Sequence, residues 1–358
     1  MAGPVDIFKK NLIEFGSGPM LEEMPPLSLE NKGIAGPTAA HKIEQIHTPL
    51  NYAYTTFTTG SSAFQTPVVV TYSELEERKK AGKEALRRCG VKPGSNIVVT
   101  YPPLVNVFSN AALNEYGVNV RFILRPSRDA LITAMCEGAD CVIGESSFVR
   151  AAIKDAMRLG LKAFMPENLV IIAAGTPLDK DLKETAEWLK GAKVHDLYGC
   201  QEFGWLILDG SALREDIILL KDPDDPEWNH IIAGGLCTGD MVKTGKHPIN
   251  SEGIICTNTA KRSEKELETL IKAASPASAD TVKRAARSIL RIKSKIVRVS
   301  RECTYSAKKT VVQIKDPEGN VFTTLEGPAA TKLLDDLIEA QKAYQSMAKN
   351  DPVWNKNR

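Results

Sequence analysis

The sequence lacks the features of a membrane protein or a secreted protein. No run in its 358 residues approaches the apolar length that a bilayer-spanning helix needs. The opening, MAGPVDIFKKNLIEF, has neither the apolar core nor the small-residue cleavage site of a secretory signal. We therefore expect a soluble protein of the cytoplasm.

The sequence also has little net charge and no framework of cysteine or histidine. A formal net charge of +2 provides no overall field to attract nucleic acid or an anionic membrane. Seven cysteines are an odd number, which is typical of free thiols in a reducing compartment. Cys136 and Cys141 are the closest pair, but no second pair of ligands accompanies them to form a zinc site. A disulfide scaffold and a structural zinc protein are both disfavoured.

What the sequence does contain is a regular alternation of apolar and amphipathic stretches over residues 93–199. Ser127 and Gly138 suit the start and the end of one amphipathic stretch as a helix. The alternation predicts an α/β fold of parallel βαβ units with helices on both faces of the sheet. Ligands of such sheets bind beyond the carboxyl ends of the strands. The expected strands are SNIVVTY, NVRFIL, DCVIGE, NLVIIAAG and KVHDLYG.

We expect three regions along the chain. Residues 1–95 form an irregular wrapping segment, rich in proline and glycine, that ends with a candidate phosphate loop. Residues 96–260 form the α/β core, which binds nucleotide and carboxylate and includes a smaller β-rich layer. Residues 261–358 form a basic and helical segment. Within it, residues 283–301 carry many basic and no acidic side chains, which fits either a solvated helix face or a docking surface.

Four short motifs carry residues suited to nucleotide chemistry. In FTTGSSAFQTP, hydroxyl side chains and a glycine can surround phosphate oxygens, although this is neither a Walker loop nor a Rossmann fingerprint. In AAGTPL, the glycine lets the backbone approach a flat ligand closely. In LYGCQE, a tyrosine can stack on a base and a glutamate can hold Mg²⁺. In CTGD, an aspartate can accept hydrogen bonds from ribose hydroxyls.

Each motif also has an ordinary structural explanation. The first fits a polar surface turn, and the second is also a plain connection from strand to helix. Tyr198 fits a core position, Glu202 the start of a helix, and Asp240 a turn in which aspartate is common.

Taken in order, the four motifs resemble the adenylate-forming superfamily, which includes acyl-CoA synthetases, firefly luciferase and the adenylation domains of peptide synthetases. The resemblance covers residues from about 50 to 260. The run TPVVVTYSEL after the first motif looks like the continuation seen in phenylacetate-CoA ligases. The implied fold is the N-terminal domain of that superfamily without its mobile C-terminal domain. The shortened form is similar to stand-alone types such as a phenazine-tailoring adenylating enzyme.

The chain departs from the family pattern at three places. Ala63, Phe64, Gln65 and Thr66 stand where the family loop continues with Gly-x-Pro-Lys, and Gln201 replaces a threonine. The hinge and catalytic lysine of the family's C-terminal domain have no counterpart after Asp240. Because Asp240 follows Glu202 after a shorter interval than usual, Asp216 is an alternative ribose ligand.

The resemblance implies that ATP and Mg²⁺ are cofactors. It assigns catalytic roles to Thr59, Ser61 and Glu202, with Glu202 as the metal ligand. The apolar acid would lie against residues 101–108 and Trp205. The residues that would bind ATP are Thr58, Thr59, Gly60, Ser61, Ser62, Gly175, Thr176, Tyr198, Gly199 and Asp240.

The expected function is adenylation of a carboxylate, which we predict to be aromatic, giving acyl-AMP and pyrophosphate. The acyl group then passes to a partner such as a reductase or another acyl-acceptor protein, and an oligomer is compatible with this function. The alternative is a catalytically degenerate protein that binds a nucleotide or an acyl ligand in a structural or regulatory role. A nucleic-acid or membrane partner is not expected.

Overall fold

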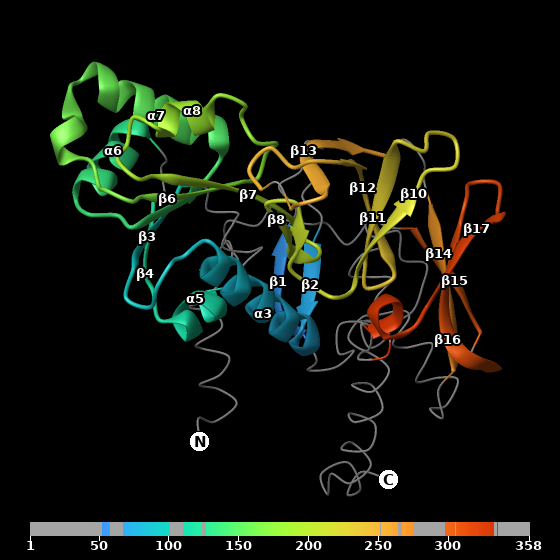
Figure 1. Cartoon of the computed structure of the whole chain (residues 1–358). Helices are drawn as coiled ribbons and strands as arrows, with labels where there is room; N and C mark the ends of the chain where they lie inside the picture. The colour runs from blue at the N-terminus through green and yellow to red at the C-terminus, as the bar shows by residue number, and fades with distance from the viewer. Residues whose placement is uncertain are drawn as a thin grey trace, which may run out of the picture.

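The computed structural model of the chain describes residues 52–57, 67–100, 110–123, 127–250, 252–263, 267–274, 298–304, 306–332 and 335. A helix-rich α/β part and a part made almost entirely of strands lie side by side (Figure 1). Among the described residues, no helix is both long and apolar enough to span a membrane.

The largest sheet has seven strands in the order β4-β3-β5-β6-β7-β8-β9. The first five are parallel, and β8 and β9 are antiparallel to their neighbours. β5 and β6 are buried along their whole length, as expected for strands covered on both faces. The predicted parallel α/β fold is confirmed. The strands are β3 (Asn96–Val99), β4 (Asn119–Phe122), β5 (Cys141–Gly144), β6 (Val170–Ala174), β7 (Lys193–Cys200), β8 (Gly204–Leu208) and β9 (Ser211–Ala212).

Helices cover both faces of this sheet (Figure 1). One face packs against α6, α7 and α8, and the other against α3 and α5. Ser127 caps α6 as predicted, because its Oγ accepts a hydrogen bond from the Ala130 backbone N–H at 3.1 Å. Gly138, with φ +95°, follows the end of that helix. The helices are α3 (Tyr72–Arg88), α5 (Asn110–Tyr116), α6 (Arg128–Cys136), α7 (Ser146–Arg158) and α8 (Leu182–Ala186), with a 3₁₀ turn at Leu161–Phe164.

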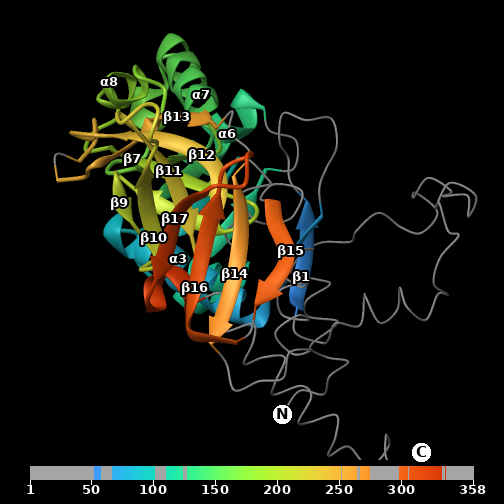
Figure 2. The same ribbon diagram turned by 90° about the vertical axis from the view of Figure 1, so that its right-hand side faces the viewer.

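Two four-stranded sheets form the β-rich part. One is antiparallel with the order β10-β11-β12-β13, and the other has the order β15-β14-β16-β17 (Figure 2). In the second sheet, β14 pairs in parallel with β15 and antiparallel with β16. The strands are β10 (Ile217–Lys221), β11 (Trp228–Ala233), β12 (Leu236–Thr244), β13 (Ile255–Arg262), β14 (Glu268–Ala274), β15 (Arg298–Thr304), β16 (Ser306–Lys315) and β17 (Val321–Glu326).

The structure corrects the expectation of a helical segment after residue 261. The described residues between 268 and 326 form strands β14 to β17, and helix begins only at residues 328–332. Val312 and Ile314 on β16 and Leu325 on β17 are buried, and Val312 lies opposite Leu325. This alternation of buried and more exposed positions favours strands. Most of the basic stretch 283–301 lies outside the described residues.

Strand β8 belongs to two hydrophobic cores at once. Leu206 and Ile207 pack into the core of the β-rich part, with residues of both four-stranded sheets. Trp205 and Leu208 pack on the α/β side, under α3 and α5. Trp205 is 2% exposed in that core, and its place in the acid pocket stays a prediction. Through β8, the two parts share one packed interior.

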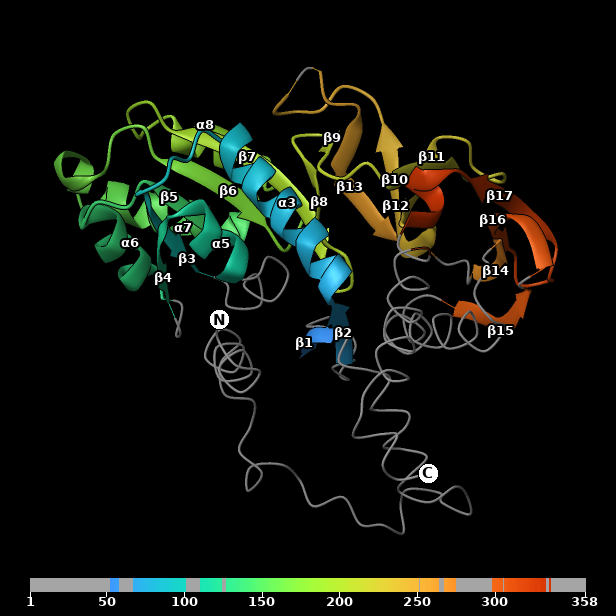
Figure 3. The ribbon, with the colours of Figure 1, turned by 90° about the horizontal axis from the view of Figure 1, so that it is seen from below.

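The candidate phosphate loop connects a β-hairpin. β1 (Tyr52–Phe57) pairs antiparallel with β2 (Pro67–Thr71), and Phe57 lies opposite Pro67. β2 leads directly into α3, and Figure 3 shows the hairpin at one end of that helix. Thr58, Thr59, Gly60, Ser61 and Ser62, together with residues 63–66, lie outside the described residues, as do residues 101–108.

Candidate active site

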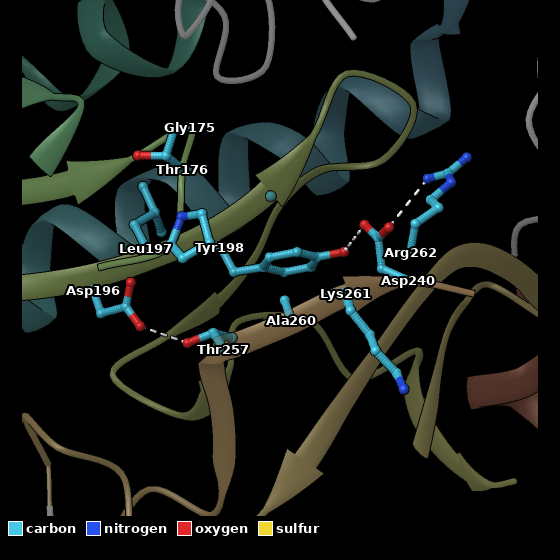
Figure 4. A pocket seen from close by; sticks show the side chains of 12 residues that line it. Gly175, Thr176, Asp196, Leu197, Tyr198, Asp240, Thr257, Ala260, Lys261 and Arg262 are labelled. Atoms are coloured by element: carbon cyan, nitrogen blue, oxygen red, sulfur yellow. Dashed lines mark hydrogen bonds and ion pairs between the residues drawn. The ribbon is translucent and has the colours of Figure 1, made fainter. Parts of the chain in front are cut away.

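A pocket of about 220 Å³ lies where the carboxyl ends of β6 and β7 meet the antiparallel sheet (Figure 4). This is the edge at which parallel sheets bind their ligands. The α/β part contributes the ends of two strands, and the antiparallel sheet contributes β12 and β13. The lining residues are Gly175, Thr176, Pro177, Asp196, Leu197, Tyr198, Gly199, Asp240, Thr257, Ala260, Lys261 and Arg262.

Tyr198, Asp240 and Arg262 form a chain of hydrogen bonds along the pocket (Figure 4). The Tyr198 hydroxyl donates to Asp240 Oδ2 at 2.6 Å, and Arg262 Nη1 donates to Asp240 Oδ1 at 3.1 Å. Burial and the charge of Asp240 raise the pKa of Tyr198 well above its usual value, so the phenol stays a donor. The carboxylate is thereby held in one orientation by two donors. Each of its oxygens keeps a second lone pair for a ligand.

At two positions near the pocket, neighbouring atoms lie so close to the backbone that only glycine fits. A Cβ on Gly199 would lie 2.5 Å from the Gly204 carbonyl oxygen, at an irregularity in the pairing of β7 with β8. A Cβ on Gly239, at φ +83°, would lie 2.9 Å from the Arg262 guanidinium carbon. The absence of a side chain on Gly239 therefore leaves room for the Arg262 guanidinium to reach Asp240, the next residue after Gly239.

A buried network supports the floor of the pocket. Thr257 Oγ1 donates to Asp196 Oδ2 at 2.5 Å, and His247 Nε2 lies 3.1 Å from the same oxygen. The Ile249 backbone N–H donates to His247 Nδ1, so the Nε2 hydrogen is the one directed at Asp196. Both Asp196 and His247 are buried. These contacts fix one oxygen of Asp196, whose residue lines the pocket beside Tyr198.

Glu202 lies on the turn between β7 and β8 and is 8% exposed. Burial and the charges of Glu202 and Asp240 raise the pKa of the Cys200 thiol well above its usual value. The thiol therefore stays neutral between these two carboxylates. In nucleotide sites, Mg²⁺ is commonly held by one or two carboxylates and by phosphate oxygens. Glu202 supplies a carboxylate of this kind next to the pocket residues Tyr198 and Gly199 in the chain, but it is not itself among the residues that line the pocket. The described residues contain no group of three or more His, Cys, Asp or Glu side chains arranged to hold a metal.

The structure thus brings five of the predicted ATP-binding residues to one pocket, from three separate stretches of the chain. They are Gly175, Thr176, Tyr198, Gly199 and Asp240. The five predicted residues of the phosphate loop lie outside the described residues. Asp216, the alternative ribose ligand, is wrong for this pocket, because it is buried in an ion pair with Arg214 at 2.7 Å and is not among the lining residues.

Sequence reasoning missed Arg262, Thr257 and Asp196. Arg262 follows Asp240 by 22 residues, and only the register of β12 against β13 places the two directly opposite. An opposite-charge pair across two strands is a favourable arrangement, but the sequence alone does not fix which residues face each other. The missed signal was a basic pair, Lys261 and Arg262, shortly after the expected strand GIICTN.

Comparison with solved structures finds several ligases of low similarity. A 2-hydroxyisobutyryl-CoA ligase is 12% identical, with 74% of this chain and 76% of that chain covered and a TM-score of 0.45. ATP-bound MatB from Rhodopseudomonas palustris is 12% identical, with 75% and 66% covered and a TM-score of 0.46. Because these TM-scores are below 0.5, we draw no conclusion from them.

Comparison of sequences is more informative. The family model described as the MadH C-terminal domain matches residues 209–345, which hold the β-rich part after β8. The ACP-SH:acetate ligase of Malonomonas rubra is 45% identical over 356 residues, covering 96% of this chain and 96% of the relative. This confirms the predicted enzyme class, a ligase. It lends no support to the phenazine-tailoring type or to an aromatic acid. By this similarity along nearly its whole length, the chain belongs to the family of the ACP-SH:acetate ligase.

Proposed function

We propose that this chain is an ATP-dependent ligase that activates a short carboxylate as an acyl-adenylate and passes the acyl group to a carrier-protein thiol. The observation that carries the proposal is the pocket between the two parts of the molecule. Residues that the sequence assigned to ATP from three separate stretches line that one pocket. The relative's name, ACP-SH:acetate ligase, supports the carrier thiol and the small acid.

The pocket offers suitable partners for an adenosine moiety. The Tyr198 ring provides an apolar face, and the backbone of Gly175 and Thr176 can approach a flat base. The Asp240 carboxylate, oriented by Tyr198 and Arg262, can accept hydrogen bonds from ribose hydroxyls. The Arg262 guanidinium adds a cation beside that carboxylate, where it can also contact a phosphate oxygen.

The proposed reaction has two steps. A carboxylate oxygen of the acid attacks the α-phosphorus of ATP, forming the acyl-adenylate and releasing pyrophosphate. The carrier thiol sulfur then attacks the acyl carbonyl, AMP leaves, and the thiol proton passes to solvent. Mg²⁺, when bound, would neutralise charge on the phosphates, and Glu202 is the residue we propose to hold it. Thr59 and Ser61 remain predicted phosphate contacts of the loop.

The acid and the acceptor differ from the first expectation. The sequence resemblance implied an aromatic acid and a reductase partner, and no finding supports either. A relative that is 45% identical over 96% of this chain acts, by its name, on acetate and a carrier thiol. We therefore propose acetate or another short aliphatic acid and a carrier protein. The cytoplasmic location stays a prediction.

The proposal is tested by pyrophosphate release from Mg-ATP over a panel of acetate, longer aliphatic acids and aromatic acids, first without any acceptor. We expect release with acetate or a close homologue. Addition of a carrier protein bearing a thiol should then convert the acid into a thioester with stoichiometric AMP. Release with aromatic acids alone would restore the first expectation. No release with any acid, while ATP still binds, would identify the degenerate binding protein instead.

A further inference from the structure

The turn that carries Glu202 is held from both sides by two buried arginines. Arg78 Nη2, from α3, donates to the Gln201 carbonyl oxygen at 2.7 Å. Arg214 Nη1, from the segment after β9, donates to the Phe203 carbonyl oxygen at 2.8 Å. These two carbonyls belong to the residues immediately before and after Glu202. The backbone of Glu202 is therefore fixed by charged donors from two distant parts of the chain.

The two arginines lie in a buried group of four charges. Arg78 is 1% and Arg214 6% exposed, and the compensating acids Glu74 and Asp216 are each 3% exposed. Arg214 pairs with Asp216 through contacts of 2.9 and 2.7 Å and with Glu74 at 3.0 Å. Although burial alone would lower the pKa of Arg214, the charges of Glu74 and Asp216 raise it. Arg214 therefore stays charged at any pH at which the fold survives.

Such a group is an expensive way to stabilise a core. Burying four charges costs free energy that well-packed apolar residues would not require, so stability alone does not explain it. Charged donors instead form strong, directional hydrogen bonds, and a guanidinium therefore fixes the position of the carbonyls that it contacts more rigidly than apolar packing does. Here the fixed carbonyls are those of the Glu202 turn.

The position of α3 adds to this picture. It begins directly after β2, and the hairpin of β1 and β2 is connected by the candidate phosphate loop. Arg78 thus connects α3 to the turn that follows Tyr198 and Gly199.

We propose that Arg78 and Arg214 are positioning residues that hold the Glu202 carboxylate in the orientation needed at the nucleotide phosphates. The metal-binding role of Glu202 in this inference rests on the proposed function. That the two arginines fix the backbone of the turn follows from their hydrogen bonds alone.

The test compares Arg78→Lys, Arg214→Lys, Glu202→Gln and the double variant Arg78→Lys/Glu202→Gln. Arg88→Met is the control on the same helix, because Arg88 is partly exposed and contacts the Glu84 carboxylate at 2.7 Å and the Ala212 carbonyl at 3.2 Å, away from residues 201–203. Calorimetry measures the ATP dissociation constant with Mg²⁺ and with EDTA. Hydrogen exchange measures the protection of backbone amides 200–204, and thermal unfolding reports on the fold.

We expect Glu202→Gln to reduce the Mg²⁺-dependent gain in ATP affinity by about tenfold. Arg78→Lys and Arg214→Lys should each lose several-fold of the same gain, and the double variant should lose no more than Glu202→Gln alone. The backbone amides of residues 200–204 should exchange faster in the two lysine variants than in the parent, and their exchange rates should be unchanged in Arg88→Met. The inference would be overturned if the double variant lost the product of the two single-variant losses in Mg²⁺-dependent ATP affinity. It would also be overturned if a lysine variant unfolded at a lower temperature but kept the full Mg²⁺-dependent gain in ATP affinity.

The two proposals fail in different ways. If the parent binds no ATP with or without Mg²⁺, the proposed function is wrong, and hydrogen exchange then decides the inference alone. Faster exchange at 200–204 in the lysine variants would uphold the hold on the turn, and unchanged exchange would remove it. If Arg214→Lys fails to fold, Arg78→Lys supplies the answer, since it keeps the charge and loses only the fork geometry.

Discussion

The parallel sheet and the antiparallel sheet face the same pocket but contribute different chemistry to it. From the parallel sheet come strand ends, namely the backbone of Gly175 and Gly199 and the ring of Tyr198. From the antiparallel sheet come the paired charges Asp240 on β12 and Arg262 on β13, whereas the one carboxylate from the parallel sheet, Asp196 on β7, is held by Thr257 and His247. The two contributions meet at the hydrogen bond between Tyr198 and Asp240. The site therefore needs residues from both sheets.

This division follows from how each sheet is covered. β5 and β6 are buried along their whole length, so their side chains are apolar and only their ends are available to a ligand. β12 and β13 reach solvent at the pocket, so they can carry charges there. The parallel sheet therefore contributes mainly the backbone and ring surfaces of the pocket, and the antiparallel sheet contributes the ion pair of Asp240 and Arg262.

The largest expected effect tests whether the two parts fold as one unit. Ile172 on β6 and Ile232 on β11 are both 0% exposed, one in each part. Ile172→Ala and Ile232→Ala should each lower the free energy of unfolding by about 2–5 kcal/mol. Because β8 packs into both cores, each variant should shift one common transition in urea, followed by tryptophan fluorescence and circular dichroism. Two separate transitions, each sensitive to one variant, would show that the parts are independent.

The α/β part was predictable because its pattern is local. Runs such as VIIAA in β6 and CVIG in β5 are continuous and apolar, and Ser127 and Gly138 mark the ends of α6. The same holds for Tyr198 and Gly175, since a residue at the end of a predicted parallel strand has a predictable neighbourhood.

The β-rich part was less predictable because its pairing is not local. The opposition of Asp240 to Arg262 depends on the register of β12 and β13, which the sequence between them does not fix. The strands β14 to β17 lie in the stretch that was expected to be mostly helical, and their pairing joins residues as distant in the chain as Glu268 and Lys315. Arg78 and Gln201 lie 123 residues apart, so no sequence pattern could have joined them.

A smaller effect sharpens the contribution of the antiparallel sheet. Gly239→Ala places a Cβ at φ +83°, 2.9 Å from the Arg262 guanidinium. We expect a loss of about 1–2 kcal/mol in unfolding free energy from backbone strain. We also expect weaker ATP binding, because Arg262 must leave Asp240. The control is Gly138→Ala, at φ +95° with open space around its Cβ, which should lose similar stability and leave ATP affinity unchanged. Equal ATP affinity in both variants would remove Arg262 from the site.

The most direct test of the central claim, a nucleotide pocket between the two sheets, is calorimetric titration of ATP into the parent, Asp240→Asn and Asp316→Asn. Asp316, on the turn after β16, provides the same substitution at a residue that does not line the pocket. We predict that Asp240→Asn weakens binding by about tenfold or more, since it removes a charged acceptor, and that Asp316→Asn binds as the parent does. Equal affinity in all three proteins would contradict the account.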